Sequence, residues 1–350
     1  MTLRDRLTAQ IRASGPMSIA QYMSACLHDP DFGYYATRPA LGAGGDFITA
    51  PLVSQMFGEL IGLWAVETWT AMGRPAPFRL VEMGPGDGTL MSDLLRAARL
   101  SPGFTQAADV WLVEVSEPLR GLQRQRLGER VSWANALAEV PGEAPLLLVA
   151  NELLDCLPAR QFVRTERGWA ERLVGLSDAG DLAFGLAHLP MIKDAPTGAI
   201  LENSPAQEAL GAELGARIAR DGGAALLIDY GRAEPGFGDT LQALRAHTKE
   251  DPLGHPGEAD LTIHADFPAV ADAAVREGAQ AAPILTQGEF LVRLGIGARA
   301  EALASARPDM ADKIERQLER LVSPDEMGEL FKVACIHAPG IVPPGFEDLP

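Results

Sequence analysis

The stretch VEMGPGDGTL, residues 81–90, decides the expected fold, because an apolar run passes directly into three glycines and then into a helical pattern. The run FRLVEM at 78–83 predicts a buried strand, and TLMSDLLRAARL at 89–100 has the apolar spacing of a helix. Glycine allows backbone angles and close approaches that other residues do not, so a ligand can lie against bare backbone at this turn. A tight strand-to-helix turn without a ligand is the alternative. The three glycines are Gly84, Gly86 and Gly88.

Around this turn, short apolar runs alternate with helical patterns. Continuous apolar strands separated by helices are typical of a parallel sheet that is covered on both faces. We therefore expect an α/β fold with a doubly wound, Rossmann-like core. The further strands predicted for this core are VWLVEVS (110–116), RVSWA (130–134), PLLLVAN (145–151) and AALLIDYG (224–231), and the helices between them are predicted at 118–128 and 204–220.

The patterns divide the chain into three parts. Residues 1–74 are expected to form N-terminal helices with a long loop rich in proline and glycine, and residues 161–199 an antiparallel insertion. The core would comprise 75–160 and 200–350, with loop-rich and helical elaboration at 232–325. After a loop-rich stretch at 232–267, helices are expected near 268–278 and 299–322. Strands at 283–288 and 329–338 would complete the far edge of the sheet.

Composition and charge disfavour several classes of protein. The 350 residues carry 30 Lys plus Arg against 47 Asp plus Glu, and the resulting net charge of −17 disfavours nucleic acid and anionic lipid as partners. No apolar run approaches the roughly 20 residues that span a bilayer, so no transmembrane segment is expected. The three cysteines are scattered and the six histidines lack ligand spacing, so we expect reduced thiols and no metal site.

The spacing and charge of the glycine turn indicate which ligand it binds. Its glycines follow G-x-G-x-G, whereas the dinucleotide fingerprint requires G-x-G-x-x-G to bind a pyrophosphate. Glu82 and Asp87 flank the turn, and both would repel a pyrophosphate but attract a cation. Glu114 ends the second strand, where a carboxylate can accept hydrogen bonds from both ribose hydroxyls; a solvated side chain is the alternative. A nucleoside with a positive charge meets these conditions, so we expect S-adenosylmethionine as the cofactor.

A second polar cluster follows the fourth strand in NELLDCLP, residues 151–158. Asn151, Glu152 and Asp155 emerge at the same edge of the sheet as the glycine turn, so they are the candidate catalytic residues. Two carboxylates can hold a guanidinium through bidentate hydrogen bonds and keep its nitrogen in line with a methyl group. The alternative is that Asn151 and Asp155 cap a following helix.

Several blocks of the sequence together resemble the MidA-like S-adenosylmethionine-dependent methyltransferases, a family that includes a mitochondrial complex I assembly factor that methylates an arginine. The glycine turn alone indicates only a class I methyltransferase, whereas GGDFITAP with NELLDCLP is much more specific. The matching blocks span nearly the whole chain and are HDPDFGYYATR (28–38), GGDFITAPLVSQMFGEL (44–60), EMGPGDGTL (82–90), NELLDCLPARQF (151–162), LLIDYG (226–231), GEADLTIHADF (257–267), GEFLVRLG (288–295) and MGELFKV (327–333).

The resemblance implies roles for particular residues. The turn glycines would contact the cofactor, Glu114 its ribose, and the 151–155 cluster would lie where the methyl group leaves. Residues of the early loop would fold over the same pocket. Those loop residues are Gly45, Asp46, Phe47 and Thr49. The sequence departs from the family pattern at Ala50 and Leu52, which replace a more usual Ser and Glu, and at Asp87, which stands where many relatives carry Arg.

The resemblance also implies methyl transfer to a protein side-chain nitrogen, with an arginine of a respiratory complex I subunit as the substrate. Two alternatives remain. One is a module that binds S-adenosylmethionine and holds a partner during complex I assembly without turnover. The other is a nicotinamide-dependent dehydrogenase, which the glycine spacing disfavours. The expected compartment is the bacterial cytoplasm, or the mitochondrial matrix for a eukaryotic source, and the oligomeric state stays open, with a homodimer as one option.

Overall fold

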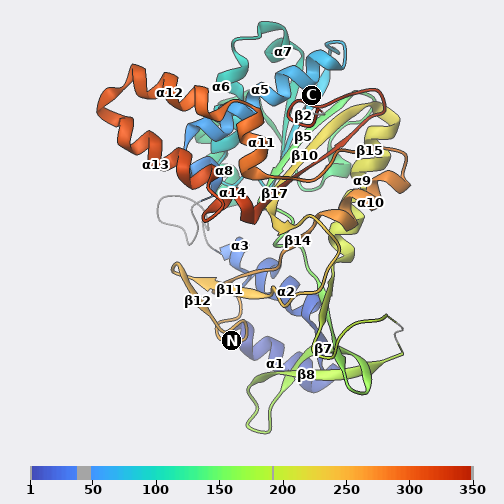
Figure 1. Cartoon of the computed structure of the whole chain (residues 1–350). Helices are drawn as coiled ribbons and strands as arrows, with labels where there is room; N and C mark the ends of the chain where they lie inside the picture. Colours follow the sequence, from blue (N-terminus) through green and yellow to red (C-terminus); the bar gives the residue numbers. More distant parts are fainter. Residues whose placement is uncertain (1, 38–48, 191–192, 348–350) are drawn as a thin grey trace.

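The structure is a computed structural model that describes residues 2–37, 49–190 and 193–347 (Figure 1). Its central sheet confirms the expected α/β class. From one edge to the other, the strands of this sheet are β4 (Ser132–Ala134), β3 (Ala108–Val113), β2 (Phe78–Met83), β5 (Leu146–Asn151), β10 (Gly223–Arg232), β17 (Phe331–His337) and β15 (Gln280–Ala281), with β14 (Ala265–Asp266) beside β10 and β16 (Leu285–Thr286) beside β17.

The order of these strands indicates at which point of the sheet edge a ligand binds. β2 pairs in parallel with β3 on one side and with β5 on the other, so the chain order reverses at β2. β10 continues the parallel sheet, and β17 closes it in the antiparallel direction. Open sheets of this kind bind ligands outside the carboxyl ends of their strands at such a reversal. The predicted glycine turn leaves β2 at this point.

Helices cover both faces of the central sheet, as expected for strands that are buried along their whole length. All six residues of β5 are buried, because the strand has neighbours on both faces. On one face Trp64 and Leu94 pack with Leu80, and on the other Leu214 packs with Leu148. The helices of the first face include α5 (Gln55–Ala71), α6 (Thr89–Ala98), α11 (Gln287–Arg293), α12 (Ile296–Ala306), α13 (Ala311–Val322) and α14 (Met327–Leu330), and those of the second are α9 (Pro205–Asp221) and α10 (Phe267–Arg276). The short helices α4 (Ala50–Val53) and α7 (Pro102–Ala107) and the helix α8 (Glu117–Leu127) connect these elements.

A second group of elements lies below the central sheet in Figure 1 and has its own apolar core. An antiparallel sheet of β1, β6, β7, β8 and β9 forms its base, and a small sheet of β11, β12 and β13 lies nearer the central sheet. β1 comes from the N-terminal part of the chain and pairs with β7. The bounds are α1 (Leu3–Ser14), β1 (Met17–Ser18), α2 (Ile19–His28), α3 (Tyr34–Thr37), β6 (Arg160–Thr165), β7 (Gly168–Leu176), β8 (Leu182–Leu189), β9 (Ile200–Asn203), β11 (Gln242–Arg245), β12 (Thr248–Glu250) and β13 (Asp260–Thr262).

Two local expectations were wrong, and a third was incomplete. The stretch 232–267 is loop-rich as expected, but it also contains the small β11–β13 sheet, whose tight turn at Ala246 and His247 uses positive φ angles without any glycine. The expected helix at 299–322 is two helices, because Pro308 cannot continue a helix. The strand expected at 283–288 is limited to β16, after which α11 begins.

Candidate active site

A pocket of about 370 Å³ opens at the carboxyl ends of β2, β3 and β5. It brings together the glycine turn, the acid after β3 and the polar cluster after β5, as the sequence predicted. Elements outside the core complete its wall with aromatic and polar side chains. The lining residues from these outer elements include His28, Tyr34, Tyr35, Thr49 and Asp260.

Gly84 and Gly86 of the glycine turn line this pocket, whereas the predicted cofactor residue Gly88 does not; all three have backbone in the left-handed region. The φ angles of Gly84, Gly86 and Gly88 are 65°, 53° and 81°, values that strain any residue with a Cβ atom. A Cβ atom on Gly84 would lie 3.1 Å from the Cδ1 of Leu153, which also lines the pocket. Gly88 then caps the N-terminus of α6. The turn therefore presents bare backbone and the start of a helix to a ligand.

The two acids beside the turn have different surroundings. Glu82 is buried, and burial raises the pKa of its carboxyl well above the ordinary range. Its Oε2 accepts no hydrogen bond from the described residues. The Oδ1 of Asp87 accepts hydrogen bonds from the backbone and side chain of Thr89, and it also pairs with Arg126 at 3.0 Å. Much of the charge of Asp87 is thus balanced by Arg126, so the expectation that Asp87 attracts a cationic ligand is weakened.

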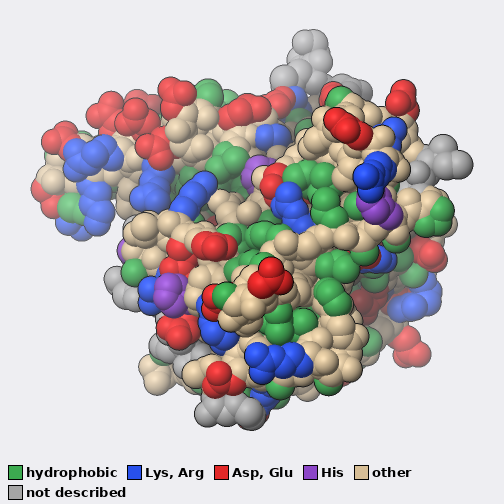
Figure 2. Space-filling model, turned by 90° about the horizontal axis from the view of Figure 1, so that it is seen from below, with side chains coloured by type: hydrophobic (Ala, Val, Ile, Leu, Met, Phe, Trp, Pro, Cys, Tyr) green, Lys and Arg blue, Asp and Glu red, His purple; other side chains and the backbone are tan. Residues whose placement is uncertain are grey.

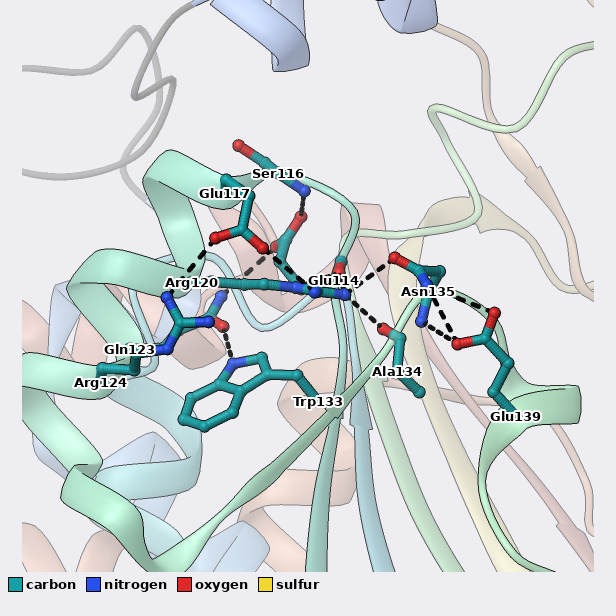
Figure 3. Close-up of polar contacts among 10 residues, drawn as sticks. All are labelled: Glu114, Ser116, Glu117, Arg120, Gln123, Arg124, Trp133, Ala134, Asn135 and Glu139. Carbon is teal, nitrogen blue, oxygen red and sulfur yellow. Dashed lines mark hydrogen bonds and ion pairs between the residues drawn. The ribbon is translucent and has the colours of Figure 1, made fainter.

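Glu114 lies just beyond β3 and lines the pocket from a firmly held position (Figure 3). Its Oε1 accepts a hydrogen bond from the Ser116 N–H at 2.8 Å. Burial raises the pKa of its carboxyl, and hydrogen bonds from Ser116 and Gln123 oppose that rise. Arg120 donates hydrogen bonds to the backbone carbonyl of Glu114 and to the Asn135 Oδ1, which fixes the ends of β3 and β4 together. The carboxylate is therefore buried, oriented and within reach of a ligand.

Asn151, Glu152 and Asp155 line the opposite part of the pocket. Glu152 has a φ of 54°, and its Oε1 accepts hydrogen bonds from the Ala50 N–H at 3.3 Å and from the Asn151 Nδ2 at 3.1 Å. Burial and the neighbouring Asp155 raise the pKa of Glu152 to about 7, and burial raises the pKa of Asp155 to about 6. Turns, not a helix, follow at 152–156, so the helix-cap alternative is wrong.

Two residues at the end of β10 support this acidic cluster. The Tyr230 hydroxyl donates a short hydrogen bond to the Asp155 Oδ2. Asp229 is fully buried behind the cluster, and its Oδ2 accepts hydrogen bonds from the backbone N–H groups of Leu154 and Asp155 at 2.8 Å and 3.1 Å. Asp229 therefore fixes the backbone that carries Asp155. Burial, with the nearby charges of Asp155 and Glu152, raises the pKa of Asp229 well above its ordinary value.

The sequence of this chain is similar to those of known methyltransferases. A family described as putative S-adenosyl-L-methionine-dependent methyltransferases matches residues 60–285. The protein arginine methyltransferase NDUFAF7, mitochondrial, of Danio rerio is 35% identical over 95% of this chain and 86% of its own length. The human protein of the same name is 35% identical over 93% of this chain and 81% of its own length. The chain belongs to this methyltransferase family.

A solved structure agrees with the family's cofactor. The likely methyl transfer enzyme from Burkholderia thailandensis, crystallised with S-adenosyl-homocysteine, superposes with a TM-score of 0.85 at 29% identity, and the match covers 99% of this chain and 92% of that chain. The resemblance inferred from sequence is confirmed. As a methyltransferase of this family, the chain uses S-adenosylmethionine, and the dehydrogenase alternative is wrong.

The residues present fit the methyltransferase cofactor. The left-handed glycine turn leaves room for a ligand against the backbone, and the buried carboxylate of Glu114 offers acceptors for hydroxyl groups. The exposed apolar Val115 lines the pocket beside Glu114 and could cover a base. Of the early loop, Thr49 lines the pocket. Gly45, Asp46 and Phe47 lie outside the described residues.

Sequence reasoning missed several residues of this methyltransferase site. Gln123, Arg120 and Tyr230 were not among the site residues that the sequence predicted. Gln123 carries no local signal, because it binds the Gly86 carbonyl oxygen 37 residues away. Arg120 binds the nearby Glu114 carbonyl oxygen, and a backbone acceptor leaves no mark in the sequence pattern. Within the described residues, no group of three or more His, Cys, Asp or Glu side chains is arranged to hold a metal ion. No described helix is long and apolar enough to cross a membrane.

Proposed function

We propose that this methyltransferase transfers a methyl group to a guanidinium nitrogen of an arginine side chain in a protein. One observation carries the proposal: six carboxylates and neither lysine nor arginine occur among the described residues that line the pocket. Arg126 pairs with Asp87 and burial raises the pKa of Glu82, so not all six carry a free negative charge. With no lysine or arginine among the described lining residues, the pocket still favours a cation over an anion. The six carboxylates belong to Glu82, Asp87, Glu114, Glu152, Asp155 and Asp260.

Each half of the pocket would bind one cation: one half the cofactor, the other the arginine side chain. The glycine turn and Glu114 would hold the cofactor, which when bound supplies an activated methyl group. Glu152 and Asp155 would bind the guanidinium, because a planar fork of N–H donors matches carboxylate oxygens. Alignment of the nitrogen with the methyl carbon is worth several kcal/mol of the barrier, on the order of 7–11 in favourable cases. One of these carboxylates would then accept the proton that the nitrogen releases. Asn151 would orient Glu152 through its Nδ2.

The names of the relatives support the choice of arginine over other nitrogens, since curated relatives from several animals are named protein arginine methyltransferases. We propose an arginine of a complex I subunit as the acceptor, as the resemblance of the sequence implies. The names of the relatives include the word mitochondrial, which suits the mitochondrial matrix if the source is eukaryotic. For a bacterial source we propose the cytoplasm.

On the face drawn in Figure 2, Lys and Arg side chains are scattered among Asp and Glu and form no continuous basic surface over its described residues.

The test uses complex I subunits purified from cells that lack this chain. The subunits are incubated with the full chain and S-adenosylmethionine labelled in its methyl group, and the labelled residues are then located by mass spectrometry. We expect label on arginine, and a loss of at least about tenfold in rate for Asp155→Asn. Glu67→Gln, an exposed change on α5, is the control and should leave the rate unchanged. Label on lysine alone, or none, would contradict the proposal.

The same experiment separates catalysis from a scaffold role. Asp155→Asn retains the size of the side chain and an oxygen that accepts from Tyr230. If this variant still binds the partner but no longer methylates it, the protein is not a scaffold alone. If the wild type binds both the cofactor and the partner without any methyl transfer, the scaffold alternative holds and the enzyme proposal fails.

A further inference from the structure

Gln123 of α8 is a fully buried glutamine that contacts both the glycine turn and Glu114. Figure 3 draws it together with Glu114 and Trp133. Its Nε2 donates a hydrogen bond to the Gly86 carbonyl oxygen at 2.7 Å. The same nitrogen lies 3.4 Å from the Glu114 Oε2 and points a second N–H toward it. One side chain thus connects the glycine turn with the acid that follows β3, although Gln123 itself does not line the pocket.

Trp133 fixes which way the amide of Gln123 faces. The indole Nε1–H of Trp133 donates to the Gln123 Oε1 at 2.8 Å. An indole nitrogen can only donate, so the amide oxygen must face Trp133 and the amide nitrogen must face Gly86 and Glu114. In the reversed amide, the amide nitrogen would face the Trp133 Nε1–H, another donor. The amide oxygen would face the Gly86 carbonyl oxygen and the Glu114 Oε2, which are acceptors. The tryptophan ring is in turn covered by the Arg124 guanidinium, 5.0 Å from the ring centroid.

The contacts on Glu114 define the plane of its carboxylate. The Ser116 N–H binds Oε1, and Gln123 approaches Oε2, so each oxygen has its own donor. A carboxylate with donors on both oxygens is held in one orientation, with the remaining lone pairs directed elsewhere. α8 also packs directly on the turn, since a Cβ atom on Gly88 would lie 3.5 Å from the Gln123 Cγ.

We propose that Gln123 is a positioning residue for the cofactor, whose Nε2 holds the Gly86 peptide and the Glu114 carboxylate at the separation that an adenosine requires. This inference deepens the proposed function and rests on Glu114 as the ribose ligand. Gln123 does not touch the reacting atoms. Its effect is on cofactor affinity, with little effect on the chemical step once the cofactor is bound.

The test measures binding of S-adenosyl-homocysteine to the full chain by isothermal titration calorimetry. Gln123→Leu removes both donors while it keeps the volume similar, and we expect binding to weaken about tenfold, with kcat unchanged at saturating cofactor. Trp133→Phe removes only the donor to Oε1, leaves Nε2 in place and should weaken binding by no more than about twofold. Wild-type protein that fails to bind the ligand would contradict the cofactor assignment, whereas equal binding by wild type and Gln123→Leu would overturn the inference about Gln123.

A second variant gives a signature that loss of packing cannot imitate. The side chain in Gln123→Glu keeps its shape, but at neutral pH its carboxylate has no hydrogen to donate to the Gly86 carbonyl oxygen or to the Glu114 Oε2. We therefore expect Gln123→Glu to bind S-adenosyl-homocysteine more weakly than Gln123→Leu does. When its new carboxyl is protonated at lower pH it can donate again, so the deficit of this variant should shrink as the pH falls. The deficit of Gln123→Leu should grow, because Glu114 loses a donor that favours its ionised form. Parallel pH dependence in both variants would overturn the proposal.

Discussion

The Tyr230 hydroxyl donates a short hydrogen bond to the Oδ2 of Asp155, and this contact joins the end of β10 to the turn after β5. Tyr230 is buried, and its ring packs edge-on against His264 and Phe331, which leaves the hydroxyl little freedom. A donor fixed on a carboxylate favours the ionised form. Burial raises the pKa of Asp155, and Tyr230 opposes that rise, so its hydroxyl lowers the pH at which Asp155 can bind a cation.

Removal of that donor should move the pH profile of methyl transfer. Without the hydroxyl of Tyr230 the pKa of Asp155 rises above its value of about 6, so the acid limb of kcat/KM should shift upward. Hydrogen bonds to charged groups contribute about 1.5–3 kcal/mol, so we expect Tyr230→Phe to shift the limb by about one pH unit. Rates measured across the acid and neutral range will show the shift.

Tyr22→Phe is the matched control for this prediction. The Tyr22 hydroxyl is also buried and donates to the Pro252 carbonyl at 2.8 Å, but it lies outside the pocket lining. Its loss should reduce stability by about 1 kcal/mol and leave the pH profile in place. A profile of Tyr230→Phe that coincides with that of Tyr22→Phe would show that Asp155 does not limit the reaction.

Stability of the protein without ligands should fall as the pH rises through the acid and neutral range. The pKa of Glu152 is raised from 4.5 to about 7, so between these values the folded state binds more protons than the unfolded state. Its contribution is complete below the unfolded pKa and is lost as the pH rises through the folded pKa, a loss on the order of 3 kcal/mol. Asp155, raised from 3.8 to about 6, acts in the same direction.

Glu152→Gln removes one of these titrating groups while it keeps an acceptor for the Ala50 N–H. Urea unfolding at pH values between about 5 and 8 should give a flatter pH dependence for this variant than for wild type. Glu67→Gln replaces a carboxyl by an amide on an exposed face and should keep the wild-type slope. Identical slopes in wild type and Glu152→Gln would mean that Glu152 is ionised without penalty in the folded state.

Glu114→Gln tests the ribose contact directly. The amide keeps the oxygen that accepts from Ser116, but it loses the charge and places a donor toward either Gln123 or the pocket. We expect S-adenosyl-homocysteine to bind at least about tenfold more weakly, with little change in thermal unfolding. Glu129→Gln, at an exposed site after α8, is the control. Undiminished binding by Glu114→Gln would remove Glu114 from the cofactor site.

The sequence allowed prediction of the sheet and of the pocket's position because those features depend on local patterns. Strands buried on both faces, such as β5, are continuous apolar runs in the sequence. The closely spaced glycines of the turn likewise indicate backbone with positive φ angles. The partners of individual side chains could not be predicted in the same way. Asp87 pairs with Arg126, 39 residues away, and this pairing depends on how α8 packs beside the turn. The β11–β12 turn likewise uses Ala246 and His247 at positive φ, where no glycine or asparagine signals it.

Gly84→Ala should separate backbone strain from loss of the ligand-binding surface. At a φ of 65° a methyl group costs about 1–2 kcal/mol, and here it would also meet Leu153 at 3.1 Å beside the pocket. Gly73→Ala is the matched control, because Gly73 has a φ of 82° and a Cβ atom there meets nothing within 4 Å. Both variants should lose similar stability in urea unfolding, but only Gly84→Ala should also weaken binding of S-adenosyl-homocysteine, by at least about tenfold. If Gly84→Ala binds this ligand as well as Gly73→Ala does, the cofactor does not lie against the backbone at the exit of β2.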